Sequence, residues 1–274
     1  MESPSGWVSQ IGVQAVTAVG HVGRVTVLTA QTLQNAVRRP FRTQMVLLQM
    51  EAIGVRSIPI VFLTAMFTGM VLVLQTAVGL ARYGAEEQSS GVAALAFARE
   101  MGPVLTALIV AGRVGAGIAA EVGTMKVTEQ IDALRTLAAN PVHYLVVPRV
   151  IAAALMLPIL TICGDVVGLF GGYVVGVYSI GIPSTTYTQI ALEWLQVRDV
   201  ASGIIKTPLF GVIIGVISCY HGFEATGGAE GVGRATTRAV VWGSILILTA
   251  NYIQTDIILR YTDTVANWIT RFLP

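Results

Sequence analysis

Long uninterrupted apolar runs set the first limit on what this chain can fold into. The run from Ile58 to Ala81 carries no charged side chain, and similar stretches recur along the 274 residues. A helix needs about 20 such residues to cross a bilayer. Only 12% of the residues are charged, against about a quarter in soluble domains. The sequence therefore predicts an integral membrane protein.

The apolar runs predict about five membrane spans in one domain, residues 1–274. The expected spans are 58–81, 91–120, 144–179, 200–220 and 239–259. Residues 1–43 hold a helix with a narrow polar stripe and a basic turn, a pattern typical of a helix lying in the membrane interface. A weakly hydrophobic extra span is the alternative for that helix. The predicted fold class is an all-α membrane protein, with an interfacial helix in 1–43 and a transmembrane bundle in 44–274.

The distribution of arginine predicts the orientation in the membrane. Arg38, Arg39 and Arg42 precede the first span, and basic clusters favour the cytoplasmic side. The turn from Arg82 to Ser90 is acidic on balance and is expected outside. An odd number of spans then places the N-terminus in the cytoplasm and the C-terminus in the periplasm.

The segment from Glu121 to Asn140 differs from the spans around it. It is polar, and Asn140-Pro141 gives it a stop signal, so it is predicted to be one cytoplasmic helix between the second and third spans. Its short apolar face must pack on something. Packing on neighbouring spans and a lever moved by a soluble partner are both open at this point.

Polar and small residues inside the spans mark further features. The adjacent Arg99 and Glu100 need a functional or packing reason, since charges are costly in a membrane. A ladder at four-residue spacing predicts close helix packing: Gly164, Gly168, Gly172 and Gly176. Asp165, Lys206 and Asp256 could instead form the ion relay of a secondary transporter or channel. No inverted repeat of broken helices accompanies them, which disfavours that class.

The sequence holds no motif for catalysis. A phosphate-binding loop needs a lysine directly after a glycine, and neither Lys126 nor Lys206 has one. The three histidines are scattered, so no metal site is predicted. We expect no catalytic residue and no cofactor in this chain, and the missing constellation also disfavours an intramembrane enzyme.

Two sequence blocks carry a family resemblance. The first, AREMGPVLTALIVAGRVGAGIAAEVGTMKVTEQIDAL, runs from Ala98 to Leu134, and the second, GRATTRAVV, runs from Gly233 to Val241. With Asn140-Pro141 between them, the chain resembles the MlaE-type (YrbE-type) permease family. These proteins are the membrane subunits of MCE-associated ABC transporters, which move phospholipids or other lipids.

The resemblance implies an assembly in the bacterial inner membrane. It consists of a homodimer of this chain, separate ABC ATPase subunits that bind ATP and Mg, often a STAS-domain protein, and an external MCE-domain protein. The substrate is phospholipid, and no nucleic acid is involved. Residues 121–140 would be the coupling helix that docks into the ATPase, with these coupling residues: Glu121, Lys126, Glu129, Gln130, Asp132 and Arg135.

The resemblance also implies a lipid pocket between the two copies, formed by the first span and the start of the second. Carried over by position, its residues are Leu72, Gln75, Gly79, Tyr83, Arg99, Glu100 and Met101. The alternative is that Arg99 and Glu100 only pair with each other, or with Lys206 and Glu193, to fix helix packing.

Overall fold

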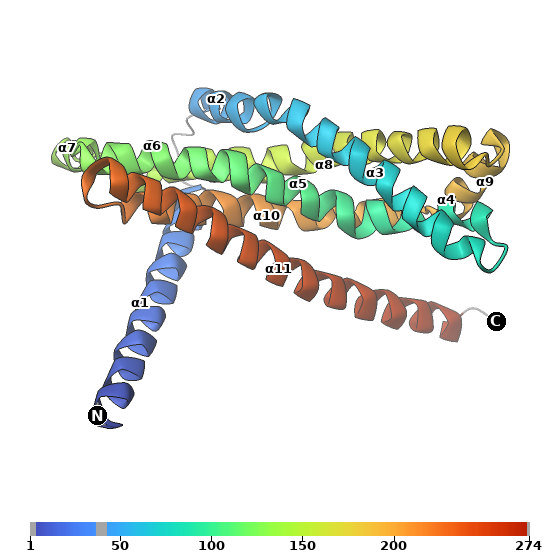
Figure 1. Cartoon of the computed structure of the whole chain (residues 1–274). Helices are drawn as coiled ribbons and strands as arrows, with labels where there is room; N and C mark the ends of the chain where they lie inside the picture. Colours follow the sequence, from blue (N-terminus) through green and yellow to red (C-terminus); the bar gives the residue numbers. More distant parts are fainter. Residues whose placement is uncertain (1–3, 37–42, 273–274) are drawn as a thin grey trace.

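The computed structural model is a bundle of long helices from which one helix departs at a steep angle (Figure 1). It describes the backbone of residues 4–36 and 43–272, with side chains in the ranges 19–36 and 43–260. Every regular element within these ranges is a helix, which confirms the all-α prediction. The basic cluster Arg38 to Arg42 falls outside the described residues.

Four helical segments among the described residues are long and apolar enough to cross a membrane: Thr43–Ala81, Glu86–Val127, Val142–Ile180 and Val197–Phe223. The first contains α2 (Thr43–Ile53), η1 (Val55–Ser57) and α3 (Ile58–Ala81). The second contains η2 (Glu86–Gln88), α4 (Ser89–Ala96), η3 (Phe97–Met101), α5 (Gly102–Val110), η4 (Ala111–Gly115) and α6 (Ala116–Val127). The third contains η5 (Val142–Val146), α8 (Val147–Val175) and η6 (Gly176–Ile180), and the fourth is α10 (Val197–Phe223).

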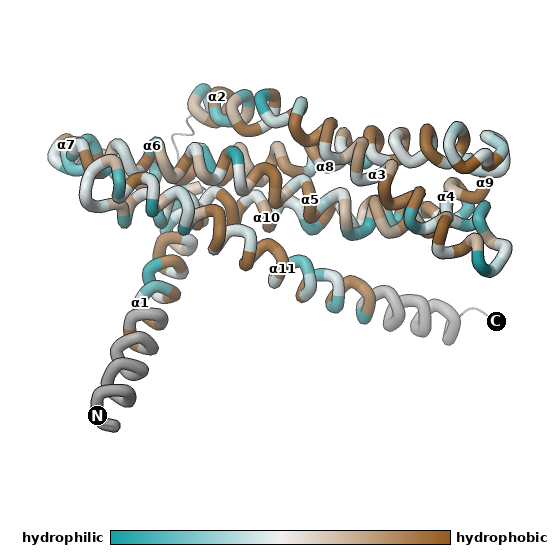
Figure 2. The backbone as a smooth tube through the Cα atoms, in the orientation of Figure 1, coloured by the Kyte–Doolittle hydropathy of each residue, from teal (hydrophilic) through white to brown (hydrophobic). Residues whose placement is uncertain are grey.

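The fifth expected span, 239–259, lies in α11 (Gly228–Phe272), which is not among these four segments. Asn251, Gln254 and Asp256 interrupt its apolar run, and polar residues alternate with apolar ones along the helix in Figure 2. α11 nevertheless packs on α10 and α6. It runs back toward the end of the bundle that holds α9 (Ser184–Trp194) (Figure 1). It therefore has the course of a fifth span but a more polar surface.

Helix α1 (Pro4–Ala36) leaves the bundle near the end that holds α7 (Figure 1). Part of its polar stripe bonds to α10 and does not face solvent. His21 Nδ1 lies 2.6 Å from the Tyr220 hydroxyl, and Arg24 Nε lies 3.2 Å from a carboxylate oxygen of Glu224. These polar contacts connect α1 to the end of α10.

The prediction of one helix from Glu121 to Asn140 is wrong. Helix α6 continues to Val127, and the separate α7 (Gln130–Thr136) has only 7 residues. Glu129 between them has a left-handed backbone with φ of 61°, and Ala138 after α7 has φ of 56°. Left-handed residues end helices, which explains both stops. The apolar face of α7 packs on the bundle, since Ile131 is fully buried in its core.

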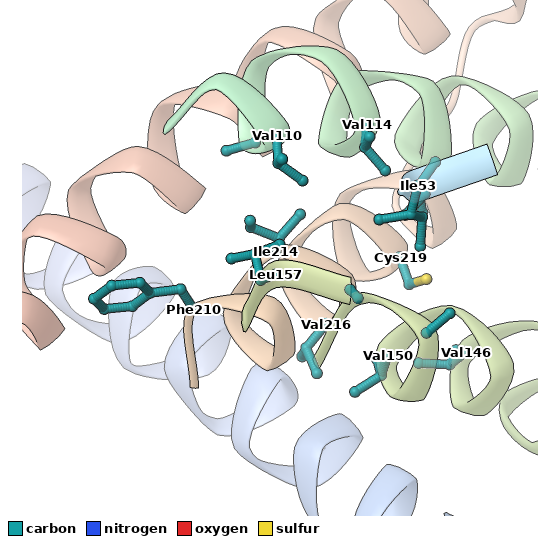
Figure 3. Close-up of a cluster of buried hydrophobic side chains, with 14 of the residues drawn as sticks. Ile53, Val110, Val114, Val146, Val150, Leu157, Phe210, Ile214, Val216 and Cys219 are labelled. Atoms are coloured by element: carbon teal, nitrogen blue, oxygen red, sulfur yellow. The ribbon is translucent and has the colours of Figure 1, made fainter. Parts of the chain in front are cut away.

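The core lies where the second, third and fourth segments meet. Figure 3 shows side chains of α5, α8 and α10 converging there. Val110, Leu157, Phe210 and Ile214 are each at most 1% exposed. Lipid tails are as apolar as these side chains, so the cluster holds the membrane segments together by close van der Waals packing and not by removal from water.

Glycines let the backbones approach closely around α8. A Cβ atom at Gly168 would lie 2.2 Å from the Phe97 ring, and one at Gly69 of α3 would lie 1.9 Å from the Gly168 carbonyl oxygen. A Cβ at Gly176 would lie 2.3 Å from the Tyr187 ring of α9. Backbone and rings cannot yield at such distances, so α3 and η3 pack on α8, and α9 packs on η6, only because glycine stands at these positions.

We expect Gly168→Leu to lower the free energy of unfolding by about 1–3 kcal/mol or more, because the new side chain overlaps the Phe97 ring. Thermal unfolding of the purified protein in detergent measures this. The matched control is Gly117→Leu in α6, where a Cβ atom meets nothing within 4 Å. Equal unfolding midpoints for the two variants would contradict the close packing.

Candidate functional site

Charged and polar side chains from different helices meet inside the bundle. Lys206 of α10 lies 2.6 Å from Glu100 Oε1 of η3. Thr255 of α11 accepts a hydrogen bond from Lys206 at 2.8 Å and donates one to Glu100 at 3.0 Å. We call Glu100, Lys206, Asn251 and Thr255, together with Arg99 and Asp199, the charged cluster.

Lys206 is the buried centre of the charged cluster. Its side chain is 2% exposed, against 37% for Glu100. An ammonium group has three donors, and each finds an acceptor: Glu100, the Thr255 hydroxyl and the Arg99 carbonyl oxygen at 3.2 Å. A buried charge is tolerated when it is paired and fully hydrogen-bonded. Lys206 meets both conditions.

The backbone around Arg99 is built to receive this lysine. Pro103 has no N–H, so the Arg99 carbonyl four residues earlier loses its helical partner, and Lys206 bonds to it instead. Residues Phe97–Met101 form a π-helix, a feature often found at functional sites. A Cβ atom at Gly203 would lie 2.1 Å from the Ala98 carbonyl oxygen. Glycine there lets α10 approach close enough for Lys206 to reach η3.

The outer part of the charged cluster is partly exposed. Arg99 Nε lies 3.8 Å from an Asp199 carboxylate oxygen, and the Arg99 side chain is 31% exposed. Asp199 also accepts a bond from the Gln196 backbone N–H at 3.1 Å, as part of the capping box that begins α10. Asn251 donates to Glu100 Oε2 at 2.9 Å. Arg99 and Glu100 thus keep free surface while their partners hold them in place.

Of the other residues predicted to bind lipid, Met101 ends η3 and is half-buried, and the rest lie on α3 or in the turn after it. Gln75, Gly79 and Tyr83 are exposed, and Leu72 is half-buried beside the cluster that contains Tyr187. The cavity that adjoins Leu72 measures about 10 Å³, which is too small for an acyl chain. In a single copy, Gln75, Gly79 and Tyr83 therefore lie on open surface, and only the partly exposed Arg99 and Glu100 of the charged cluster reach it.

A larger cavity of about 610 Å³ lies elsewhere, between α1, the end of α10 and the turn at Asn140. None of the predicted lipid-binding residues lines it. Arg24, Arg135 and Glu224 are on its rim.

The predicted coupling residues form ion pairs at the end of α6 and on α7. Lys126 and Arg135 lie 3.0 and 3.1 Å from the Asp132 carboxylate. The hydrogen bond from Lys126, together with both positive charges, lowers the pKa of Asp132. Glu121 pairs at 2.9 Å with Arg149 of α8, whose side chain is 4% exposed. Glu129 and Gln130 are exposed.

The proposed ion relay is not connected in the described residues. Lys206 bonds to Glu100, and Asp256 pairs with Arg260 at 2.9 Å. Among the described residues, neither makes a hydrogen bond to the Asp165 carboxylate. Asp165 is 4% exposed and packs against Gly102. Neither of its carboxylate oxygens has a hydrogen-bond partner among the described residues.

Sequence reasoning found Arg99, Glu100 and Lys206 but missed much of their surroundings. The sequence suggests Glu193 as a possible partner of this pair, and the structure has Asp199 paired with Arg99 instead. Asn251 and Thr255 were not assigned to the site. Their signal is four-residue spacing within an apolar run, which places both on one face of a helix.

Comparisons with known proteins match this chain to permeases of one family. The profile of the family described as Permease MlaE matches residues 46–257. A probable ABC transporter permease protein of Rickettsia typhi is 46% identical over 250 residues, covering 91% of this chain and 96% of the relative. The intermembrane phospholipid transport system permease protein MlaE of Haemophilus influenzae is 34% identical, covering 92% and 97%. Protein TRIGALACTOSYLDIACYLGLYCEROL 1 of Arabidopsis thaliana, a chloroplast protein, is 40% identical, covering 84% and 65%.

We expect Glu100→Gln to lower the free energy of unfolding by about 3 kcal/mol, because Lys206 then stays buried without a counter-charge. Lys206→Met added to it should recover part of the loss. Thermal unfolding in detergent measures both. Asp256→Asn is the control, since its pair with Arg260 is exposed and should be worth less than about 1 kcal/mol. A neutral Glu100→Gln would contradict the assigned role of Glu100.

Proposed function

The chain belongs to the MlaE permease family, and from this premise we propose that it moves phospholipid or a related lipid between the inner membrane and an external MCE-domain partner. It is the non-catalytic membrane subunit of an ABC transporter, and ATP is hydrolysed by a separate subunit. ATP and Mg are then bound by that ATPase partner, with no cofactor in this chain.

The observation that carries the proposal is the half-exposed charge pair Arg99 and Glu100, set among apolar helices and fixed from behind by Lys206. An amphipathic ligand needs this combination. The guanidinium of Arg99 suits a phosphate, and the neighbouring apolar side chains suit acyl chains. The cluster pairs Arg99 with Asp199 and Lys206 with Glu100, so its two positive and two negative charges balance. A headgroup that itself carries both charges can then bind to it.

The open surface in one copy supports a homodimer. Phe67, Leu74 and Val78 of α3 are 55%, 44% and 64% exposed, next to the predicted lipid-binding residues. A second copy related by two-fold symmetry would place the same surface opposite this one. The lipid pocket is then a space shared by the two copies, lined by Leu72, Gln75, Gly79, Tyr83, Arg99, Glu100 and Met101.

The end of the bundle that holds α7 is proposed to be cytoplasmic. The ATPase docks on the exposed residues of α7 and its flanks, and its movement reaches the bundle through the Glu121–Arg149 pair. The N-terminus is then cytoplasmic, α1 lies in the membrane interface, and α11 returns to the periplasmic side as the last span. A STAS-domain protein is a further proposed partner in the cytoplasm.

One observation favours a second candidate, an ion-coupled transporter. The buried Asp165 carboxylate has no hydrogen-bond partner among the described residues, as a proton carrier could. Lipid or ion transport that follows a pH gradient in vesicles without any ATPase would support this candidate over the ABC reading.

Photocrosslinkers at Leu72 and Met101 are expected to capture phospholipid in the assembled transporter, because both positions border the shared pocket. Mass spectrometry of the crosslinked protein identifies the adduct. Crosslinkers at Ile162 and Val166 of α8, which are 45% and 64% exposed, are the control for contact with bulk lipid. Capture only at the α8 positions would reject the pocket.

Arg135→Ala is expected to weaken ATPase binding and to reduce lipid transfer several-fold, because Arg135 lies exposed on α7. Co-purification of the ATPase and lipid transfer in reconstituted vesicles measure these effects, and Glu129→Ala should act in the same direction. The control is Arg82→Ala, which removes a similarly exposed charge directly after α3, in the turn that is proposed to be external. Full ATPase binding and lipid transfer in both α7 variants would show that α7 is not the coupling element.

A further inference from the structure

Arg113 is a charged residue inside an apolar segment, and the proposed function has so far given this residue no role. It lies in the π-helix η4 (Ala111–Gly115), within the Glu86–Val127 segment. Its side chain is exposed. Its Nη1 donates a hydrogen bond to the Ser57 hydroxyl at 2.8 Å.

Arg113 differs from the other cations inside the bundle. Arg99 pairs with Asp199, Lys206 with Glu100, and Arg149 with Glu121. No ion pair to Arg113 occurs among the described residues. Ser57 does not neutralise it, because a hydroxyl is uncharged and the Ser57 proton is donated to the Ile53 carbonyl at 2.6 Å. In a membrane-spanning segment, a cation with no counter-charge in the described chain favours one from outside it, and anionic groups are available at the headgroup level.

The surroundings of Arg113 leave room for a ligand. Gly112 and Gly117 are exposed, and a Cβ atom at either would meet nothing within 4 Å. Gly117 follows Arg113 by four residues and so lies on the same helix face. The guanidinium therefore lies beside exposed glycine backbone, where no side chain blocks the approach of a lipid.

The position of Arg113 matches one membrane leaflet. Ser57 directly precedes α3, whose other end at Ala81 leads into the external turn of the proposed orientation. Arg113 lies fourteen residues beyond Arg99 in the same segment, or about 21 Å at 1.5 Å per residue. It is thus placed near the inner headgroup level, well away from the charged cluster.

From these observations we propose that Arg113 and Ser57, with the bare backbone at Gly112 and Gly117, form an inner phosphate site that binds the headgroup phosphate of an inner-leaflet phospholipid. The planar guanidinium donates paired hydrogen bonds in a geometry that fits phosphate oxygens. The inference rests on the proposed function and orientation, and it adds a second lipid contact to the pocket at Arg99 and Glu100.

The test uses the full chain with a photocrosslinker at Gly117, reconstituted in nanodiscs of phosphatidylglycerol or of digalactosyldiacylglycerol, which has no phosphate. We expect capture of phosphatidylglycerol to exceed capture of the galactolipid. Arg113→Gln should reduce phosphatidylglycerol capture about tenfold, as loss of a charge-assisted hydrogen bond implies. Arg113→Lys should retain part of it, and the control Arg82→Gln should leave it unchanged. Unfolding midpoints verify that each variant is folded.

Capture that is equal for both lipids, or unchanged by Arg113→Gln, would overturn the inner phosphate site. Competition by millimolar inorganic phosphate would assign the site to the free ion and would also overturn it. A crosslinker at Met101 in the same preparations separates this inference from the proposed function. If Met101 captures lipid and Gly117 does not, only the inner site fails, whereas the reverse result rejects the outer pocket alone.

Discussion

The ammonium group of Lys206 is the constraint around which the centre of the bundle is built. A buried charge must find a counter-charge and an acceptor for every proton. Here the acceptors come from η3 and α11, while the lysine comes from α10. Satisfying one side chain thus fixes the relative positions of three helices. The π-helix and Pro103 serve that arrangement because they leave the Arg99 carbonyl without its usual helical partner. Gly203 serves it because it lets α10 approach η3 closely.

The same requirement explains why α11 is more polar than the other long helices. Asn251 and Thr255 are needed as partners of Glu100 and Lys206, and each lowers the hydropathy of the helix that carries it. The sequence of α11 must therefore meet two opposing requirements. A membrane span needs apolar residues, and the charged cluster needs polar ones. The bundle resolves this by packing α11 on α10 and α6, with Asn251 and Thr255 half-buried and bonded to Glu100. Trp242, Ile245 and Leu248 remain exposed on the helix.

The sequence was sufficient for the class of the fold and for the most apolar segments, because hydropathy and segment length depend on local composition. It also singled out Arg99 and Glu100, since charges stand out in an apolar run, and the structure places both in the charged cluster. It could not give the break at Glu129. A left-handed glutamate carries no sequence signal, and the periodic apolar residues on both sides suggested continuity. Nor could it give the partners of Glu100, because Lys206 and Thr255 reach it across 106 and 155 positions of the chain. Contacts at that separation depend on how the helices pack.

Charged residues recur along the second segment from the charged cluster to the end of the bundle that holds α7. Arg99 and Glu100 are in one π-helix, Arg113 is in the next, and Glu121 pairs with the buried Arg149 a few turns later. These residues share one nearly continuous helical run, Glu86–Val127. A rigid run transmits displacement along its axis, while each π-helix adds a residue to a turn and can be removed by a local shift of hydrogen bonds. If α7 is the coupling element as proposed, its displacement reaches the bundle at the Glu121–Arg149 pair. The two π-helices are the irregular turns of this segment, and they hold Arg113 and the Arg99–Glu100 pair.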